Sequence, residues 1–475
     1  MADGTDSLVV RTIRGARMDR DAVVVGGGLA GTLAVGALLG QVDRVTLVER
    51  DRFPVGPEGR KGVPQGRHLH VFLSGGQRAL DELLPGVGAE LAAAGAHRLE
   101  MPRDILTRMP GGWQRRFHEG RHALVSCTRP LLDHVVRARV LAEAAGSGTR
   151  LEIVEGAEVV GLLGDEDRVT GVRIQDRGRA GERDLAAAFV VDASGRGSRA
   201  PEWLAGLGRA APREEVVDAG LAYATRMFRL AEPPDAGVYI MPTPDVPRGG
   251  AAVPVEDGRW LVTLSGERGH EPPTGEGEFL DFAASLAHPY LYGLIKTAEP
   301  VSGVHGFRNT ANRRRHYDAP GGVPEGFVAI ADAACAFNPV YGQGMAVAAL
   351  SGLALRDVLA NGGLRPGLAA EVQGAAARAA DTAWLTATAA DRPRAAAGAA
   401  SLGLVDRLKS RYFSRLTARV AVDPTVGAAY RDLLSLTVPL SRLLTPAIAA
   451  RVLLLPRRRG LADPPLEVGP GPDGG

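Results

Sequence analysis

Three glycines and one carboxylate near the start of the chain are spaced so that they could hold one ligand. Gly26, Gly28 and Gly31 follow the apolar run of residues 22–25, which is too short and too β-branched for a helix. In such a turn the first glycine permits the bend, the second lets a pyrophosphate approach the backbone, and the third lets helix and strand pack closely. Glu49 ends a second expected strand, where its carboxylate can accept hydrogen bonds from a ribose. The pattern predicts a dinucleotide site, and a structural turn without a ligand is the alternative.

A second carboxylate with flanking glycines occurs near the middle of the chain. Asp192 follows the buried run of residues 187–191 and precedes Gly195. Ligands of open α/β sheets bind at the carboxyl ends of the strands, which is where this carboxylate is expected. An ordinary tight turn is the alternative interpretation.

A third strand-to-helix transition lies some 300 residues after the first one. Residues 326–331 are expected to form a strand that ends at Asp332, and the turn from Pro339 to Gly344 precedes a helix of small residues. The N–H groups at such a helix N-terminus suit a developing negative charge. We expect the first and last of these segments to belong to one nucleotide site, with the intervening residues as an insertion.

A basic stretch broken by proline and glycine follows Glu49. It contains Arg50, Arg60 and Lys61 and ends with two histidines at residues 68 and 70. Such a loop can simply be solvated. Beside a dinucleotide it could instead lie over the pyrophosphate or guide NADPH.

The elements that must position these residues follow from apolar periodicity and turn residues. Thr128 and Pro130 open an expected helix through residue 145, with Thr128 as its N-cap. Residues 157–163 and 169–175 suit a hairpin of antiparallel strands beside a parallel sheet. Strand-like runs are also expected over 151–154 and, in three short pieces, over 103–127, and residues 74–84 are expected to be helical.

Residues 216–307 have the alternating pattern of a second sheet. Strands are expected over 223–230, 237–241, 251–255 and 260–265, followed by a helix near 276–287. We interpret this sheet as the cover of a substrate pocket, although aromatic stripes of this kind are also typical of a plain core. The predicted pocket residues are Tyr223, Met227, Trp260, Phe337 and Pro339.

Bulk composition limits the classes of function. The chain has 475 residues and a formal net charge of +2, so nothing points to nucleic acid. Its two cysteines fit neither a metal spacing nor a disulfide framework, which favours a reducing cytoplasm. The apolar stretch 433–455 is interrupted by prolines and arginines, which argues against a simple transmembrane helix. Residues 1–17 lack the apolar core of a signal peptide.

Taken together, the ordered motifs resemble one family, the FAD-dependent monooxygenases of the para-hydroxybenzoate hydroxylase type. The resemblance rests on the glycine turn with Glu49, on Asp192-Ala-Ser-Gly195 and on Ala331-Asp332, over roughly residues 18–360. The family commonly has glycine at the position of Ala331. Within it, the chain is most similar to bacterial epoxidases that act on polyene precursors of polyether ionophores. The segments that carry this similarity are 60–70, 257–266, 312–318 and 336–342.

The resemblance implies a domain layout and a fold class. The fold is α/β: an FAD-binding Rossmann-like, three-layer domain with an inserted mixed or antiparallel β-sheet substrate domain and a C-terminal helical region. The implied FAD-binding domain is discontinuous and the substrate domain has two pieces, while composition predicts disordered tails at both ends. The ranges are 18–80, 120–215 and 308–365 for FAD, 81–119 and 216–307 for substrate, 366–460 for the helices, and 1–17 and 461–475 for the tails.

The resemblance also implies roles for individual residues. Glu49 would bind the adenosine ribose, Val159 the adenine through its main chain, Arg129 the flavin side, and Asp332 the ribityl or pyrophosphate. The remaining implied cofactor residues are Gly26, Gly28, Leu29, Ala30 and Gly31 at the pyrophosphate, Arg50, Arg60, Lys61 and Asp192 nearby, and Gly342, Gly344 and Met345 at the flavin edge. The oxygen site would lie near Pro339, Val340, Tyr341 and Gly342.

The implied reaction is oxygen insertion from O2 through a flavin C4a-hydroperoxide. The hypothesis we favour is epoxidation of an alkene in a hydrophobic polyene or polyketide intermediate of antibiotic biosynthesis, either free or tethered to a carrier protein. NADPH or NADH would supply electrons directly or through a separate flavin reductase. No catalytic base is needed, because an alkene has no acidic proton to remove.

Three other functions remain open at this point. An aromatic hydroxylase would gain from a base such as Tyr223 or Tyr239. Flavin halogenases carry a Trp-x-Trp-x-Ile-Pro motif, whereas the four tryptophans here (Trp113, Trp203, Trp260 and Trp384) are isolated. A non-catalytic flavin-binding protein would hold FAD without consuming oxygen.

Overall fold

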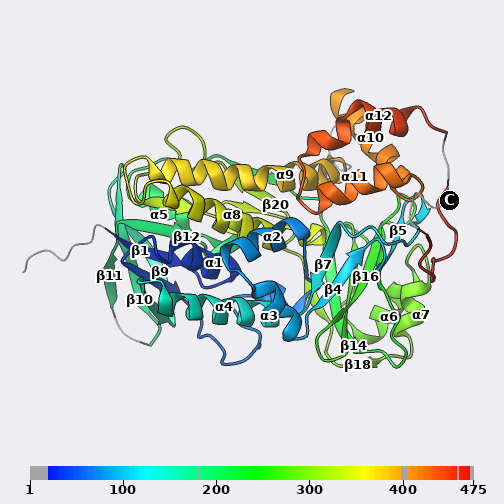
Figure 1. Ribbon diagram of the computed structural model, residues 1–475, viewed down its shortest axis with the longest axis horizontal. Coiled ribbons are helices and arrows are strands. Elements are labelled where there is room, and N and C mark those ends of the chain that lie inside the picture. Colours follow the sequence, from blue (N-terminus) through cyan, green and yellow to red (C-terminus); the bar gives the residue numbers. More distant parts are fainter. Residues whose placement is uncertain (1–19, 179–180, 397–403, 457–458, 471–475) are drawn as a thin grey trace, which may run out of the picture.

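The computed structural model describes residues 20–178, 181–396, 404–456 and 459–470. The tail predicted over residues 1–17 and the last five residues lie outside the described residues. Two large sheets dominate the fold, and they occupy opposite ends of the molecule (Figure 1).

The first sheet is parallel and contains the glycine turn. Its five strands run in the order β21-β12-β1-β2-β8, so that segments distant in sequence lie side by side. Their carboxyl ends therefore meet at one edge, where α/β sheets bind ligands. The bounds are β1 Asp21–Val25, β2 Arg44–Glu49, β8 Arg150–Glu155, β12 Phe189–Asp192 and β21 Phe327–Ala329.

Alternating side chains of this sheet enter two separate cores, which gives the predicted three layers. Ala22 and Val24 pack under the helices, whereas Val23 and Val25 pack against a three-stranded antiparallel sheet. The helical layer contains α1 Leu29–Leu38, α2 Ser74–Leu83, α3 Val87–Ala93, α4 Arg129–Gly146 and α8 Gln343–Ala360. The opposite layer contains β9 Ala157–Gly164, β10 Val169–Asp176, β11 Glu182–Ala186 and α5 Ala200–Gly206. The α/β, three-layer prediction is confirmed, and so is the β9–β10 hairpin.

The second large sheet is mixed. Its order is β18-β14-β17-β16-β15-β5-β6, with β19 also paired to β14, and β5 runs parallel to β15. Helices α6 Glu276–Ala284 and α7 Tyr290–Ile295 cover its outer face. The strands are β5 Ile105–Met109, β6 Gly112–Trp113, β14 Ala222–Arg229, β15 Gly237–Ile240, β16 Arg248–Val255, β17 Arg259–Gly266, β18 Glu299–Pro300 and β19 His305–Phe307.

Two small antiparallel sheets connect the large ones. The first has the order β3-β7-β4 and the second β13-β20-β22. The sequence did not predict β4 or β13. The bounds are β3 Val71–Phe72, β4 His97–Met101, β7 His122–Ser126, β13 Glu214–Val217, β20 Asn312–Arg315 and β22 Cys335–Ala336.

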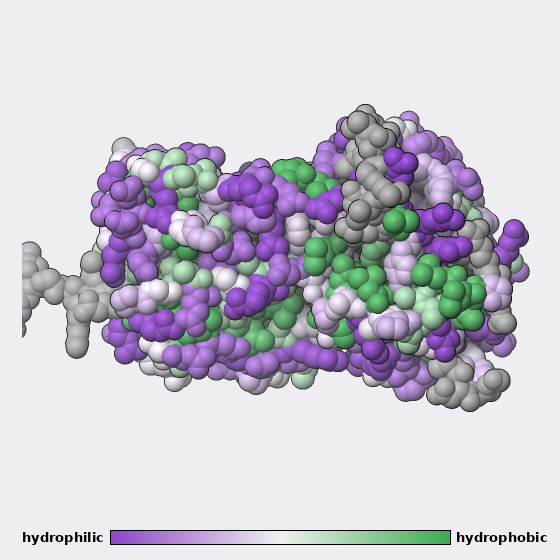
Figure 2. All heavy atoms as spheres, turned by 90° about the horizontal axis from the view of Figure 1, so that it is seen from above, coloured by the Kyte–Doolittle hydropathy of each residue, from purple (hydrophilic) through white to green (hydrophobic). Residues whose placement is uncertain are grey.

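The C-terminal region is helical, as predicted. Helix α9, Leu368–Ala396, lies along α8, and α10 Leu404–Val420, α11 Pro424–Leu434 and α12 Pro446–Leu453 sit over the mixed sheet (Figure 1). None of the described helices is long and apolar enough to cross a membrane. Seen from above, the largest cluster of hydrophobic surface lies on the half of the molecule that carries these C-terminal helices (Figure 2).

The end of the chain differs from the expected disordered tail. Leu461 pairs with Trp113 in an antiparallel bridge, and Gly469 pairs with Phe117. Arg116 Nη1 also donates to the Leu466 carbonyl at 2.6 Å. Residues 461–470 are therefore held through backbone groups at the edge of the mixed sheet, which a composition rich in proline and glycine does not reveal.

Candidate active site

One cavity of about 900 Å³ runs from the turn after β1 to helix α11. The structure brings most of the predicted site residues onto its wall. They are Gly26, Gly28, Leu29, Ala30, Glu49, Arg50, Arg129, Val159, Tyr223, Asp332, Phe337, Pro339, Val340, Tyr341, Gly342, Gly344 and Met345. Gly31, Arg60, Lys61, Asp192, Met227 and Trp260 do not line it.

The glycine turn leaves room where a phosphate would bind. Gly26 has φ +92°, and a Cβ at Gly31 would lie 1.7 Å from the Gly26 carbonyl oxygen, so both positions require glycine. Gly28 is the N-cap of α1, and a Cβ there would have no heavy atom of the described residues within 4 Å. Gly28 thus leaves open space at the N-terminus of α1, where the first N–H groups of a helix lack partners within the helix and can bind a phosphate.

Glu49 is fixed at the end of β2 by backbone donors. Its Oε2 accepts from the Gly27 N–H at 2.6 Å and its Oε1 from the Asp51 N–H at 2.8 Å. Arg60 Nη1 lies 3.3 Å from Oε2, and the guanidinium packs 4.7 Å from the Phe53 ring centroid. Arg60 thus supports Glu49 from behind rather than lining the cavity.

Asp192 has a different surrounding from the one predicted for a ligand residue. Its carboxylate is fully buried and accepts hydrogen bonds from Ser194 N–H and Oγ and from Ser198 Oγ, at 3.0, 2.5 and 2.5 Å. Burial raises the pKa of Asp192 above its ordinary value. The carboxylate therefore shapes the turn, and Ser194, Gly195 and Arg196 of that turn line the cavity instead.

Asp332 lies three residues after the end of β21, a strand of the parallel sheet. Ala331 before it has φ +49°, a left-handed conformation that glycine adopts more easily. Burial raises the pKa of Asp332, and the guanidinium groups of Arg196, Arg129 and Arg313 oppose that shift.

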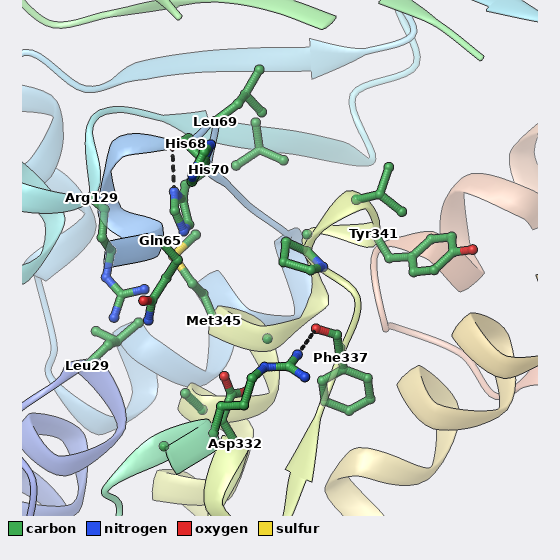
Figure 3. Close-up of a pocket in the computed structure, with 18 of the residues that line it drawn as sticks. Leu29, Gln65, His68, Leu69, His70, Arg129, Asp332, Phe337, Tyr341 and Met345 are labelled. Carbon is green, nitrogen blue, oxygen red and sulfur yellow. Dashed lines mark hydrogen bonds between the residues drawn. The ribbon is translucent and has the colours of Figure 1, made fainter. Parts of the chain in front are cut away.

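Figure 3 shows Leu29, Gln65 and Arg129 together on one side of the cavity.

The turn before α8 is held from behind by a buried polar network. Tyr341 borders the cavity but its ring extends away from it (Figure 3), and its hydroxyl donates to Asp391 Oδ1 at 2.5 Å. Asp391 on α9 also accepts from Asn312 and Asn338 Nδ2, at 2.7 and 3.2 Å. Tyr223 in turn donates to Asn338. The sequence reasoning missed this network because its members come from four distant segments.

Two histidines of the basic loop also lie on the cavity wall. His68 Nδ1 lies 2.8 Å from Thr225 Oγ1, which lies 2.7 Å from Thr263 Oγ1. Burial, assisted by His305 and Arg67, lowers the pKa of His68 to about 4. Burial, assisted by Arg129, lowers the pKa of His70 to about 3, and His70 Nδ1 donates to the His68 carbonyl (Figure 3). The motif was visible in the sequence, but its contact with the sheet was not.

The far part of the cavity is an apolar chamber. Side chains of β5, β15 and β16 and of their flanking residues form much of its wall, with α10 and α11 across from them; apolar members include Ile105, Met109, Val238, Met241, Val253 and Leu434. Trp260 was predicted to line the pocket, which is wrong: it lies in the core between the sheet and helices α6 and α7. Thr263 and Ser265 of β17 face the cavity instead.

Comparison with known proteins shows the family of the chain. Residues 21–288 match the family described as FAD dependent oxidoreductase. Protein Rv3254 of Mycobacterium tuberculosis is 33% identical over 377 residues, which cover 77% of this chain and 78% of the relative. The chain belongs to the FAD-dependent oxidoreductases.

Solved structures share the fold of this FAD-dependent oxidoreductase. The p-nitrophenol 4-monooxygenase PnpA of Pseudomonas putida superposes with a TM-score of 0.61 at 16% identity, covering 88% of this chain and 98% of that one. The flavin-dependent brominase Bmp2 superposes with a TM-score of 0.62 at 14% identity, covering 88% and 93%. At these identities the likeness shows the fold alone. The open space at Gly28, the anchored Glu49 and the cavity shared with Asp332 suit FAD.

Proposed function

We propose that this oxidoreductase is a monooxygenase that transfers one oxygen atom from O2 to an alkene of a hydrophobic polyene or polyketide. The observation that carries the proposal is the continuity of the cavity: the dinucleotide end opens into a chamber walled by Met, Val, Leu and Ile side chains. When bound, FAD supplies the activation of O2. NADPH or NADH would reduce it, directly or through a separate reductase.

In this proposal each end of the cavity has its own task. The α1 N-terminus binds the pyrophosphate, Glu49 the ribose, and Val159 the adenine. Arg129, Asp332 and the N–H groups of Gly344 and Met345 orient the other half of the cofactor. The Pro339–Tyr341 turn, fixed by Asp391, borders the reacting carbon atoms. The apolar chamber excludes water, which protects a reactive oxygen donor.

Aromatic hydroxylation is the second candidate. It is favoured by Tyr239, which lines the same cavity and could act on a phenol proton; Tyr223 also lines the cavity, but its hydroxyl donates to Asn338. His68 is a weak base, since its pKa is lowered to about 4.

The experiment that separates the two supplies a linear polyene and a phenol in parallel to the purified holoenzyme with a generic flavin reductase and NADH. Mass spectrometry of the products under ¹⁸O2 reads the result. One added ¹⁸O on the polyene alone supports epoxidation, and oxygen added only to the phenol supports the hydroxylase. Oxygen consumption without either product contradicts both.

A further inference from the structure

One guanidinium on the chamber wall is buried with much of its hydrogen-bonding capacity unused. Arg431, in the last turn of α11, is 4% exposed, and its Nε donates to Glu119 Oε2 at 2.7 Å. Within the described parts of the chain, its Nη1 and Nη2 atoms have no hydrogen-bond partner. Burying a charged group is costly unless its donors are paired. These two nitrogen atoms therefore mark a place for an acceptor.

Arg431 belongs to the apolar end of the cavity rather than the dinucleotide end, and its two unused nitrogen atoms are themselves buried. Arg431 lines the cavity together with Met109, Met241 and Leu434. A Cβ at Gly427 would lie 3.2 Å from Arg431 Nη1 and 3.4 Å from Gln114 Nε2, so the two groups are neighbours beside a residue without a side chain. Gln114 also lines the cavity, which adds a second polar group to the same place.

Arg431 shares its carboxylate partner with a second arginine. Glu119 Oε1 lies 3.3 Å from Arg121 Nη2, which itself lies 3.5 Å from Asp432 Oδ1, and the Arg431 guanidinium also packs 5.7 Å from the Phe117 ring centroid. The other arginines on the described cavity wall, which are Arg50, Arg129, Arg196, Arg199 and Arg313, come from the segments that build the cofactor end. A planar guanidinium with two free nitrogen atoms matches the two oxygens of a carboxylate.

We propose that Arg431 binds the carboxylate of the substrate, which is a free hydrophobic acid rather than a neutral thioester on a carrier. The inference rests on the proposed function, and it deepens that proposal by naming the substrate class. The carboxylate lies at α11, the hydrocarbon chain lies along the walls from β5 and β15, and the double bond reaches the turn at Pro339.

The test measures binding to the oxidised holoenzyme by isothermal titration. The probes are undec-10-enoate, undec-10-en-1-ol, methyl undec-10-enoate and the N-acetylcysteamine thioester of the acid. We expect the acid to bind about 10 to 100 times more tightly than the alcohol, the usual range for a hydrogen bond to a charged group. Equal binding of acid and alcohol, tighter binding of the thioester, or no binding of any probe would overturn the proposal.

Variants assign the preference to Arg431. Arg431→Gln should abolish the preference for the acid while the alcohol binds as before, and Arg431→Lys should reduce it, because a lysine keeps the charge but lacks the planar fork. Arg121→Gln is the matched control, since Arg121 pairs with the same glutamate but does not line the cavity. A preference that survives in Arg431→Gln, or that Arg121→Gln removes equally, would refute the assignment.

These titrations involve no reductant and no turnover. If the acid shows no preference in the titrations but the polyene gains oxygen, the carboxylate proposal fails and the monooxygenase proposal stands. If the acid is preferred but no oxygenated product forms, the monooxygenase proposal fails and Arg431 remains a carboxylate site.

Discussion

The two ends of the cavity are built in different ways. At the cofactor end, one contiguous stretch from β1 to β2 supplies the turn, the helix N-terminus and Glu49, and much of the binding capacity belongs to the backbone. At the chamber end, side chains from residues as far apart as Ile105 and Leu434 meet on one wall. A dinucleotide can be bound largely through backbone groups, whereas a specific substrate needs side chains that tertiary structure assembles.

The largest expected effect tests the backbone at the cofactor end. Gly31→Ala would place a Cβ 1.7 Å from the Gly26 carbonyl oxygen, so α1 and β1 must separate. We expect a loss of several kcal/mol in the free energy of unfolding, at or above the upper range for overpacking of about 3 kcal/mol. Thermal melting and the yield of folded protein check this. Gly146→Ala, where a Cβ meets no described atom within 4 Å, is the control and should melt near the wild type.

The stability of the fold around His68, on the cavity wall, should fall at acidic pH. The pKa of His68 is about 4 in the folded protein against 6.5 in its ordinary state. Between these values the unfolded chain binds the proton at His68 and the folded chain does not, so the contribution of His68 to stability falls as the pH drops from about 6.5 to 4, by about 3 kcal/mol in full.

Urea unfolding at pH 7 and at pH 4.5 measures this loss. His68→Asn, which retains a polar group near Thr225, should lose less stability between the two pH values than the wild type. The exposed His270→Asn serves as control. An identical pH dependence of the wild type and His68→Asn would contradict the assignment.

The buried network that holds the Pro339 turn should affect both the stability of the protein and its turnover rate. The Asp391 carboxylate accepts three hydrogen bonds. Asp391→Asn replaces one of its oxygens by an NH2 group, which is a donor and leaves a buried donor unpaired. We expect a cost of about 1–3 kcal/mol in the free energy of unfolding and a lower turnover rate. Denaturant unfolding and oxygen consumption check this. A variant as stable and as active as the wild type would show that the network does not hold the turn.

The smallest effect separates binding from folding at the glycine turn. Gly28→Ala should melt near the wild type, because its Cβ would point into open space. The same Cβ would crowd the pyrophosphate, and we expect FAD to bind about tenfold more weakly. Fluorescence titration of the apoprotein with FAD measures this. Unchanged FAD affinity would place the pyrophosphate elsewhere.

Features built from one local stretch could be predicted from the sequence, and features assembled from distant segments could not. The glycine turn, the hairpin of β9 and β10 and the Thr128 cap follow from local patterns, and the structure has them. The face of β14 and β17 that lines the cavity could not be predicted, because both faces of the sheet are buried and periodicity does not say which one meets the ligand. Trp260 was therefore assigned to the wrong face. Arg431 and Asp391 carry no local signal, since their partners are far away in sequence.

The two ends share one cavity, and we propose that FAD fills the first of them. The most direct measurement is the flavin content of the purified protein after equilibration with FAD, read from its absorption spectrum together with the spectral change on adding undec-10-enoate. We expect one FAD per chain and a flavin spectrum that the ligand perturbs. A protein that takes up no FAD, or a bound flavin whose absorption spectrum no chamber ligand changes, would contradict this arrangement.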